Sequence, residues 1–202
     1  MLTSYASRRT EIEKRLHEFN EMRKKSDKEL FAELVFCILT PQSRARNCDK
    51  AVKELFESRA VFGKAGEIKK CLKTKVRFHN TKARHIVRAR GLLNNGGIKR
   101  HLRGDAAEMR EWLVKNVYGL GYKEASHFLR NIGIGEELAI LDRHILKNLV
   151  KYRVIKELPE SMTRKRYLQI EECMKEFAEN SGIPLAHLDL LFWSGETGEI
   201  FK

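Results

Sequence analysis

The sequence has little of several features that would assign a protein class at once. Its 202 residues include only three prolines and four cysteines, and aromatic residues make up 8% of the chain. The cysteines, Cys37, Cys48, Cys71 and Cys173, form no Cys-x-x-Cys pair, so zinc or iron–sulfur ligation is not expected. No apolar run approaches the ~20 residues of a membrane span, and the N-terminus turns charged without the apolar segment of an export signal. We therefore expect an intracellular protein outside the membrane, with three of the cysteines reduced and in the core.

Negative charge is also scarce. The chain carries 40 Lys and Arg against 27 Asp and Glu, a formal net charge of +13. An excess of this size favours a polyanionic partner, and nucleic acid is the first candidate. Charged residues make up 33% of the chain, so a charge-rich protein from a hot or salty environment is the alternative at this point.

The chain shows helical spacing throughout, and no alternating strand pattern persists. Ser26 and Glu29 form a capping box that predicts a helix ending before Pro41, and the segment from Asp105 to Glu108 starts a further helix. Further helices are expected from about 43, from Asn80 or Thr81 to Leu93, over 138–150, over 162–180 with Cys173 facing inward, and from Pro184 to about Trp193. The predicted fold class is all-α, with about ten helices and no repeats.

A glycine turn separates two of these helical patterns. Gly119 and Gly121 flank Leu120, which can plug the turn against the core. Glycine permits backbone conformations barred to other residues, and the N–H groups at a helix start can bind a phosphate. Lys123 lies in the first turn of the second helix, where the helix dipole opposes an ammonium and favours a nucleophilic neutral amine. An ordinary helix corner carrying a surface lysine is the alternative.

Asp142 lies nineteen residues after Lys123, between an apolar run and the next helical pattern. Its carboxylate can cap that helix, or it can face the pocket into which Lys123 points. Arg143 and His144 add positive charge beside it.

Together these residues resemble the helix-hairpin-helix DNA glycosylase superfamily, in which Gly-(apolar)-Gly-x-Lys is followed by an Asp some 18–20 residues later. Because it has a lysine at 123, the chain resembles the bifunctional branch of this superfamily, which combines glycosylase and lyase activities. Within it the chain resembles the compact archaeal-type 8-oxoguanine DNA glycosylases. The segments that carry this resemblance are LTPQSRARN at 39–47, VRFHNTKARHI at 76–86, GLGYKEASHFLRNIG at 119–133, LDRHIL at 141–146 and LDLLFW at 188–193.

The resemblance implies a fold of two helical lobes. One would span 28–135, with the hairpin near 117–123, and the other would combine 1–27 with 136–202. No cofactor is implied, because endonuclease III-like relatives carry a four-cysteine iron–sulfur loop and this chain has only Cys173 in that region. A monovalent cation is implied at the backbone carbonyls of Lys115, Val117 and Leu120.

The resemblance also implies a reaction. A monomer would bind double-stranded DNA containing 8-oxoguanine and flip the damaged nucleotide out of the helix. Lys123 would attack the sugar at C1′, and a Schiff base followed by β-elimination would nick the strand. Asp142 would stabilise positive charge that develops on the sugar.

The remaining implied site residues contact DNA or the flipped base. The DNA contacts are the hairpin residues Gly119, Leu120 and Gly121, the probing residue Gln42, the wedge Phe78, and the polar or basic residues His79, Lys82, Arg143 and His144. Phe78 could instead be a buried loop anchor. Asp189 and Trp193 lie on one helix face and would read and stack the base, and the terminal carboxylate of Lys202 would join them if Ile200 and Phe201 dock the tail. The tail composition alone favours fraying.

Two other functions fit parts of the pattern. The same machinery could act on another lesion, such as an oxidised pyrimidine. A noncatalytic hairpin module that binds DNA structures would need the glycines but neither Lys123 nor Asp142.

Overall fold

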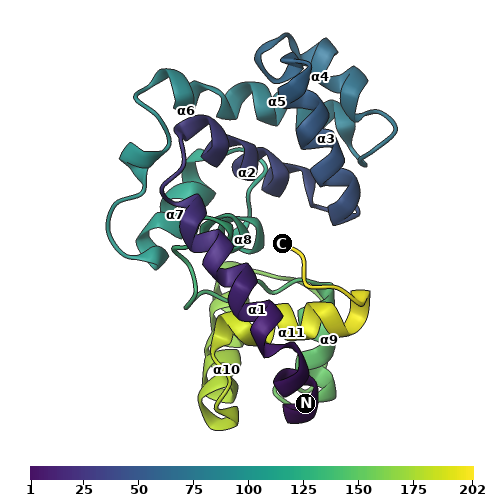
Figure 1. Ribbon diagram of the computed structural model, residues 1–202, viewed down its shortest axis with the longest axis vertical. Helices are drawn as coiled ribbons and strands as arrows, with labels where there is room; N and C mark the ends of the chain where they lie inside the picture. The colour runs from purple at the N-terminus through teal and green to yellow at the C-terminus, as the bar shows by residue number, and fades with distance from the viewer. The chain divides into compact units, whose positions relative to one another are not determined.

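The computed structural model describes residues 1–202, and these residues form helices and loops without strands, which confirms the all-α prediction (Figure 1). The chain divides into two compact units, one of residues 24–128 and one of residues 1–23 with 129–202. The boundaries expected from the sequence, 28 and 135, lie a few residues further along.

The 24–128 unit is built around α2 (Asp27–Leu39), which begins at the predicted capping box of Ser26 and Glu29. All side chains from Leu34 to Leu39 are at most 1% exposed. A helix that is apolar on all sides has to lie inside the core, and each fully buried large side chain stabilises the fold by roughly 1.5–3 kcal/mol. The other elements are α3 (Ala45–Glu57), η1 (Ala60–Phe62), α4 (Ala65–Leu72), α5 (His79–Ala89), α6 (Gly91–Asn94), η2 (Lys99–His101), α7 (Ala106–Asn116) and the first part of α8 (Tyr122–Asn131). Helices α3 and α5 both pack against α2.

The second unit is centred on α11 (Leu185–Thr197), which packs against α1 (Leu2–Met22), α9 (Arg143–Lys151) and α10 (Arg164–Ser181) (Figure 1). Gly133 follows α8 with φ +69°, and a Cβ there would lie 2.5 Å from the Cα of Asn20. Glycine at 133 therefore lets the end of α1 approach the loop after α8.

Four expectations about the helices were wrong. Helix α5 begins at His79 rather than after Asn80, because Phe78 takes the N-cap position in a left-handed conformation without a side-chain cap. Residues 138–142 are not helical, since Asp142 caps a helix that begins only at Arg143. Cys173 is exposed on α10, because Met174 is the fully buried residue at that turn. Helix α11 continues past Trp193 to Thr197 and ends where Gly198 adopts φ +85°.

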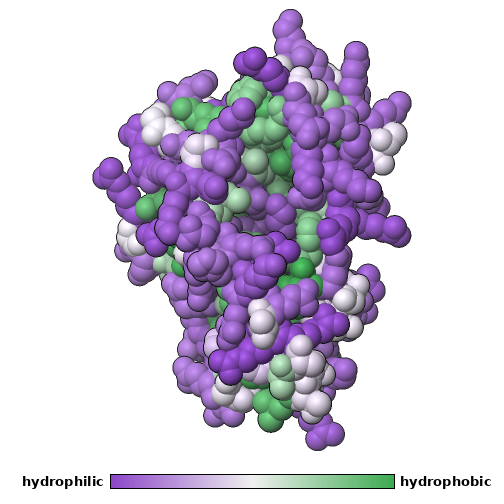
Figure 2. All heavy atoms as spheres, in the orientation of Figure 1, coloured by the Kyte–Doolittle hydropathy of each residue, from purple (hydrophilic) through white to green (hydrophobic).

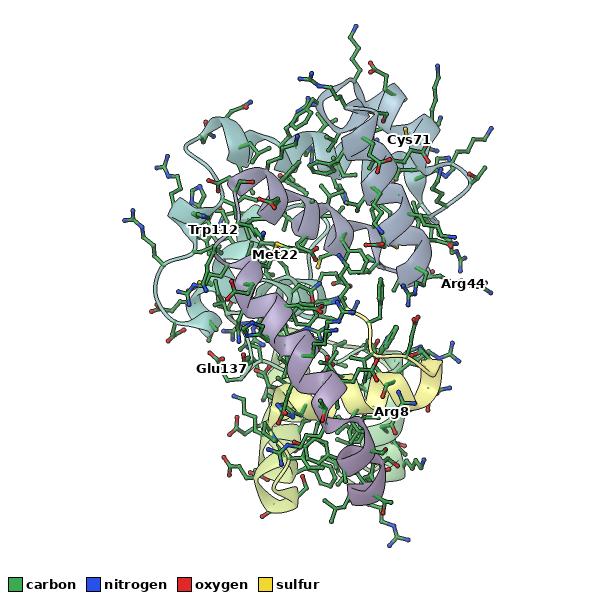
Figure 3. The ribbon with its side chains drawn as sticks, viewed as in Figure 1. Arg8, Met22, Arg44, Cys71, Trp112 and Glu137 are labelled. Atoms are coloured by element: carbon green, nitrogen blue, oxygen red, sulfur yellow. The ribbon has the colours of Figure 1, made fainter.

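Hydrophilic side chains cover most of the face drawn in Figure 2, as the composition leads one to expect. Arg44, at the start of α3, is exposed and extends outward (Figure 3). No helix is both long enough and apolar enough to cross a membrane.

Candidate active site

The glycine hairpin joins α7 to α8. Gly119 has φ +91°, and a Cβ there would lie 2.3 Å from Nδ1 of His85, so both backbone angle and space require glycine. The Leu120 side chain is 6% exposed and fills the underside of the turn, as predicted. The Gly121 N–H donates to Oε2 of Glu124 at 3.2 Å, which places a carboxylate at the start of α8. The next N–H groups of α8 have no acceptor within the helix, so the turn is suited to hold a phosphate.

Lys123 is the second residue of α8, and its side chain is 22% exposed. Its Nζ lies 3.5 Å from Oγ1 of Thr40 and 3.8 Å from Oε1 of Glu124. Both distances are at or beyond the outer limit of a hydrogen bond, so these neighbours hold the amine only loosely. A half-buried amine that is weakly held can still move toward a substrate atom.

Asp142 caps α9, as predicted. Its Oδ1 accepts hydrogen bonds from the N–H groups of His144 at 2.7 Å and Ile145 at 2.8 Å. The side chain is half-buried, and Arg143 is exposed beside it. Asp142 belongs to the unit of residues 1–23 and 129–202, whereas Lys123 belongs to the other one. The cap fixes the position of the carboxylate on its own unit and does not exclude a second role.

Gln42 and Phe78, the predicted DNA probe and wedge, share an unusual backbone conformation. Their φ angles are +52° and +56°, and only Arg59 and Arg153 join them among non-glycine residues with positive φ. This conformation costs of order 1–3 kcal/mol and tends to occur at functional sites. Phe78 is 54% exposed, so it is not a buried loop anchor. The Arg77 guanidinium lies 5.6 Å from its ring centroid.

Lys82 is buried, whereas a residue that contacts DNA directly would be expected at the surface. It is 4% exposed, and its Nζ donates to the carbonyls of Leu39 and Pro41, both at 2.8 Å, and to Oγ of Ser43 at 2.9 Å. Burial lowers the pKa of the ammonium to about 8. Direct contact between Lys82 and DNA stays a prediction, whereas its bonds to the Gln42 loop are part of the structure.

The residues predicted to recognise the base lie on α11 and in the tail. Asp189 is 7% exposed, and its Oδ2 accepts a hydrogen bond from Nη1 of Arg130 at 2.9 Å. Trp193 is partly exposed, and its ring lies 6.2 Å from that of Phe201. Ile200 and Phe201 are buried, so the tail docks rather than frays. The sequence did not predict Arg130, because a buried arginine on an apolar helix face has no motif of its own.

The buried pair of Arg130 and Asp189 leads to a stability prediction. Replacing Arg130 with methionine removes the cation that lies 2.9 Å from a buried carboxylate, which should lower the free energy of unfolding by about 3–5 kcal/mol. Arg9 forms a comparable pair with Glu13 at 2.7 Å, but its side chain is 62% exposed. Arg9→Met should leave the urea midpoint unchanged. Similar urea midpoints for the two variants would show that the buried pair does not stabilise the fold.

The remaining predicted contacts are at the surface or near it. His79 is the first residue of α5 and is half-buried. His144 is half-buried, and its Nδ1 lies 3.6 Å from Oε2 of Glu196. Thr40 and Ser43, which the sequence analysis overlooked, lie beside Lys123 and Lys82. Both are in the segment 39–47 that the resemblance had singled out, but their partners are far away in the sequence.

A cavity of about 530 Å³ lies in the unit of residues 1–23 and 129–202. None of the predicted site residues contributes to its lining, which consists of Glu136, Glu137, Lys175, Ala178, Glu179, Gly182, Ile183, Pro184 and Leu185. It therefore has no part in the proposed chemistry. No group of three or more His, Cys, Asp or Glu side chains could hold a metal ion.

An all-α chain with a glycine hairpin, a lysine at the following helix start and a capping aspartate defines a helix-hairpin-helix glycosylase fold. The family model described as 8-oxoguanine DNA glycosylase matches residues 12–183. The chain therefore belongs to the 8-oxoguanine DNA glycosylase family.

Individual relatives agree over nearly the whole chain. A Fusobacterium nucleatum protein named 8-oxoguanine DNA glycosylase/AP lyase is 46% identical over 205 residues, covering 98% of this chain and 94% of that protein. A Korarchaeum cryptofilum protein of the same name is 43% identical, covering 95% and 90%. The crystal structure of a Methanocaldococcus jannaschii 8-oxoguanine glycosylase/lyase in complex with a 15mer DNA containing 8-oxoguanine gives a TM-score of 0.87 at 37% identity, covering 96% of this chain and 93% of that one.

Proposed function

We propose that the protein is a bifunctional DNA glycosylase and AP lyase that removes 8-oxoguanine from double-stranded DNA. The observation that carries this proposal is Lys123, a half-buried and loosely held amine at the helix start that follows a glycine hairpin, in a chain of this family. A noncatalytic hairpin module would not need a lysine at this position.

In the proposed mechanism, the flipped nucleotide presents its sugar to Lys123. The lone pair of Nζ forms a bond to C1′, and the bond between C1′ and the base breaks. The base leaves with the electron pair and takes up a proton. Asp142 stabilises the positive charge that develops on the sugar and helps to move the proton of the amine.

The strand is nicked in a second stage. The nitrogen lone pair opens the sugar ring to give an imine between Nζ and C1′. Loss of a proton from C2′ then expels the 3′ phosphate, and hydrolysis of the imine returns the free lysine. All these steps use one amine, so we assign the glycosylase and the lyase reactions to Lys123.

DNA binding in this proposal rests on phosphate contacts, which offset the cost of unstacking the lesion. Gly119, Leu120 and Gly121 would bind phosphate through the backbone, with Arg143, His144, His79 and Lys82 as the other predicted contacts. Gln42 and Phe78 would fill the gap beside the orphaned cytosine.

The predicted monovalent cation has a candidate position in the hairpin. The carbonyl of Val117 accepts the Leu120 N–H at 3.2 Å, and a carbonyl has a second lone pair that could face a cation. A cation bound by this carbonyl together with the carbonyls of Lys115 and Leu120 would neutralise part of the phosphate charge. No other cofactor is proposed, and we propose that the enzyme acts as a monomer inside the cell.

The base pocket is proposed from Asp189, Trp193 and Lys202. Trp193 would stack on the flipped base, and Asp189 would accept the N7–H that 8-oxoguanine has and guanine lacks. The docked tail would bring the terminal carboxylate of Lys202 to the same base.

The tail leads to a prediction that separates base recognition from strand nicking. Deleting Lys202 should lower the rate of 8-oxoguanine excision about 10-fold or more, because the carboxylate shifts by one residue. Nicking at a preformed abasic site should stay unchanged, since no base has to be read there. Single-turnover assays on the two substrates measure both rates. Unchanged excision would remove the tail from the mechanism.

The proposed function is tested by trapping the covalent intermediate. The protein is incubated with a duplex that carries one 8-oxoguanine opposite cytosine, and borohydride is added. A trapped adduct and a nicked strand are expected. If 8-oxoguanine gives neither but an oxidised pyrimidine gives both, the substrate is the other lesion. If no lesion gives an adduct, the protein is a noncatalytic DNA-binding module.

A further inference from the structure

The loop that carries Gln42 is held by a cation from another helix. Lys82 on α5 donates to the carbonyls of Leu39 and Pro41 and to the hydroxyl of Ser43. These acceptors belong to every second residue between 39 and 43. Lys82 is 4% exposed, and in such a buried place its hydrogen bonds are stronger than in water.

Ser43 connects this loop to the wedge. Its Oγ accepts the backbone N–H of Arg77 at 3.1 Å in addition to the Lys82 ammonium. Arg77 precedes Phe78, which is the N-cap residue of α5 and has a φ of +56°. The two strained residues, Gln42 and Phe78, are therefore linked through Ser43 and Lys82.

Strained conformations persist only where surrounding contacts fix them. Gln42 is exposed, and Phe78 is 54% exposed with the exposed Arg77 guanidinium 5.6 Å from its ring centroid. The hydrogen bonds beside the two backbones include those of the loop and that from the Lys82 N–H to the Phe78 carbonyl at 3.0 Å, and Lys82 takes part in both sets.

We propose that Lys82 is a positioning residue that holds Gln42 and Phe78 ready to enter the DNA helix, acting through the 39–43 loop and Ser43. The proposal rests on the proposed function, since it assigns a role in opening the duplex. Lys123 depends on this loop only through the 3.5 Å contact with Thr40. Loss of Lys82 should therefore affect base flipping far more than the chemistry at Lys123.

A matched control lies at the end of the same helix. Arg90 is the C-cap residue of α5, and its Nη1 donates to the carbonyls of Val61 at 3.1 Å and Gly63 at 2.8 Å. Arg90→Met, like Lys82→Met, removes a cation that bridges backbone carbonyls in the 24–128 unit. The bonds lost in Arg90→Met do not involve the segments of Gln42 and Phe78. This variant therefore measures the effect of losing structural hydrogen bonds alone.

The first experiment compares two substrates in single-turnover assays. Lys82→Met should lower excision from an 8-oxoguanine duplex by about 100-fold, a loss typical of a misplaced active-site group. Nicking of single-stranded DNA with a preformed abasic site should fall by no more than about 3-fold, since no duplex has to be opened. Arg90→Met should change neither rate. Equal losses of Lys82→Met on both substrates, or an equal loss by Arg90→Met on the duplex, would overturn the proposal.

The second experiment needs no chemistry, so it still tests Lys82 if the proposed function fails. A duplex carries the fluorescent base 2-aminopurine beside a stable abasic analogue, and saturating protein is added. The native protein should raise the fluorescence by unstacking the base, whereas Lys82→Met should not. Ser43→Ala removes one hydroxyl and keeps the two carbonyl bonds, so it serves if Lys82→Met does not fold. Native-like fluorescence with the folded Lys82→Met protein, or with Ser43→Ala in its place, would overturn the proposal.

Discussion

Replacing Lys123 with glutamine should abolish the borohydride-trapped adduct and lower both excision and nicking by about 10⁴-fold, a loss in the range seen when a nucleophile is removed. Glutamine keeps much of the length and polarity of the side chain but has no amine to form an imine. The fold should be unaffected, because Lys123 makes only the contacts at 3.5 Å with Thr40 and 3.8 Å with Glu124. The thermal midpoint should therefore match that of the native protein.

The control for this variant is Lys69→Gln. Lys69 is exposed on α4 in the same unit and has no place in the proposed site. The Lys69→Gln substitution removes the same charge from the protein, and the variant should still form the trapped adduct. If Lys123→Gln still forms the adduct, the nucleophile is a different amine.

Replacing Asp142 with asparagine should lower excision about 10²–10³-fold while leaving stability unchanged. Asparagine caps a helix as well as aspartate does, so the bonds to the N–H groups of His144 and Ile145 can persist. Only the negative charge is lost, and with it the stabilisation of the positive sugar. Single-turnover excision and a urea titration measure the two effects separately.

Asp142→Ala is the companion variant. It removes both the charge and the cap, so it should lose the same activity and about 1 kcal/mol of stability in addition. If Asp142→Asn were fully active while Asp142→Ala lost activity only in proportion to unfolding, Asp142 would be a helix cap and nothing more.

The sequence predicted the features that depend on neighbouring residues. The capping box at Ser26, the helix start at Asp105, the hairpin at Gly119 and the cap at Asp142 are local motifs, because each joins residues at most a few positions apart. The start of α5 was missed because Phe78 takes a left-handed angle that no local preference favours.

The features that the sequence did not predict depend on long-range contacts. Lys82 was expected to contact DNA, but it lies buried because its acceptors come from about forty residues earlier in the chain. Asp189 was expected to read a base, and Arg130, fifty-nine residues before it, binds one of its oxygens. Helical spacing shows which face of a helix is buried, but it does not show which polar groups meet there.

The left-handed angles at Gln42 and Phe78 have a consequence for how this protein can be stabilised. Their strain lowers the stability of the free protein, and under the proposed function the contacts of the 39–43 loop hold both side chains in one arrangement before DNA arrives. Glycine would relax either backbone and delete the probing side chain with it. Selection for thermal stability alone would therefore act against these two positions, and selection for repair would restore them. The loops around Ser43 and Arg77 are thus where improved stability and retained activity conflict.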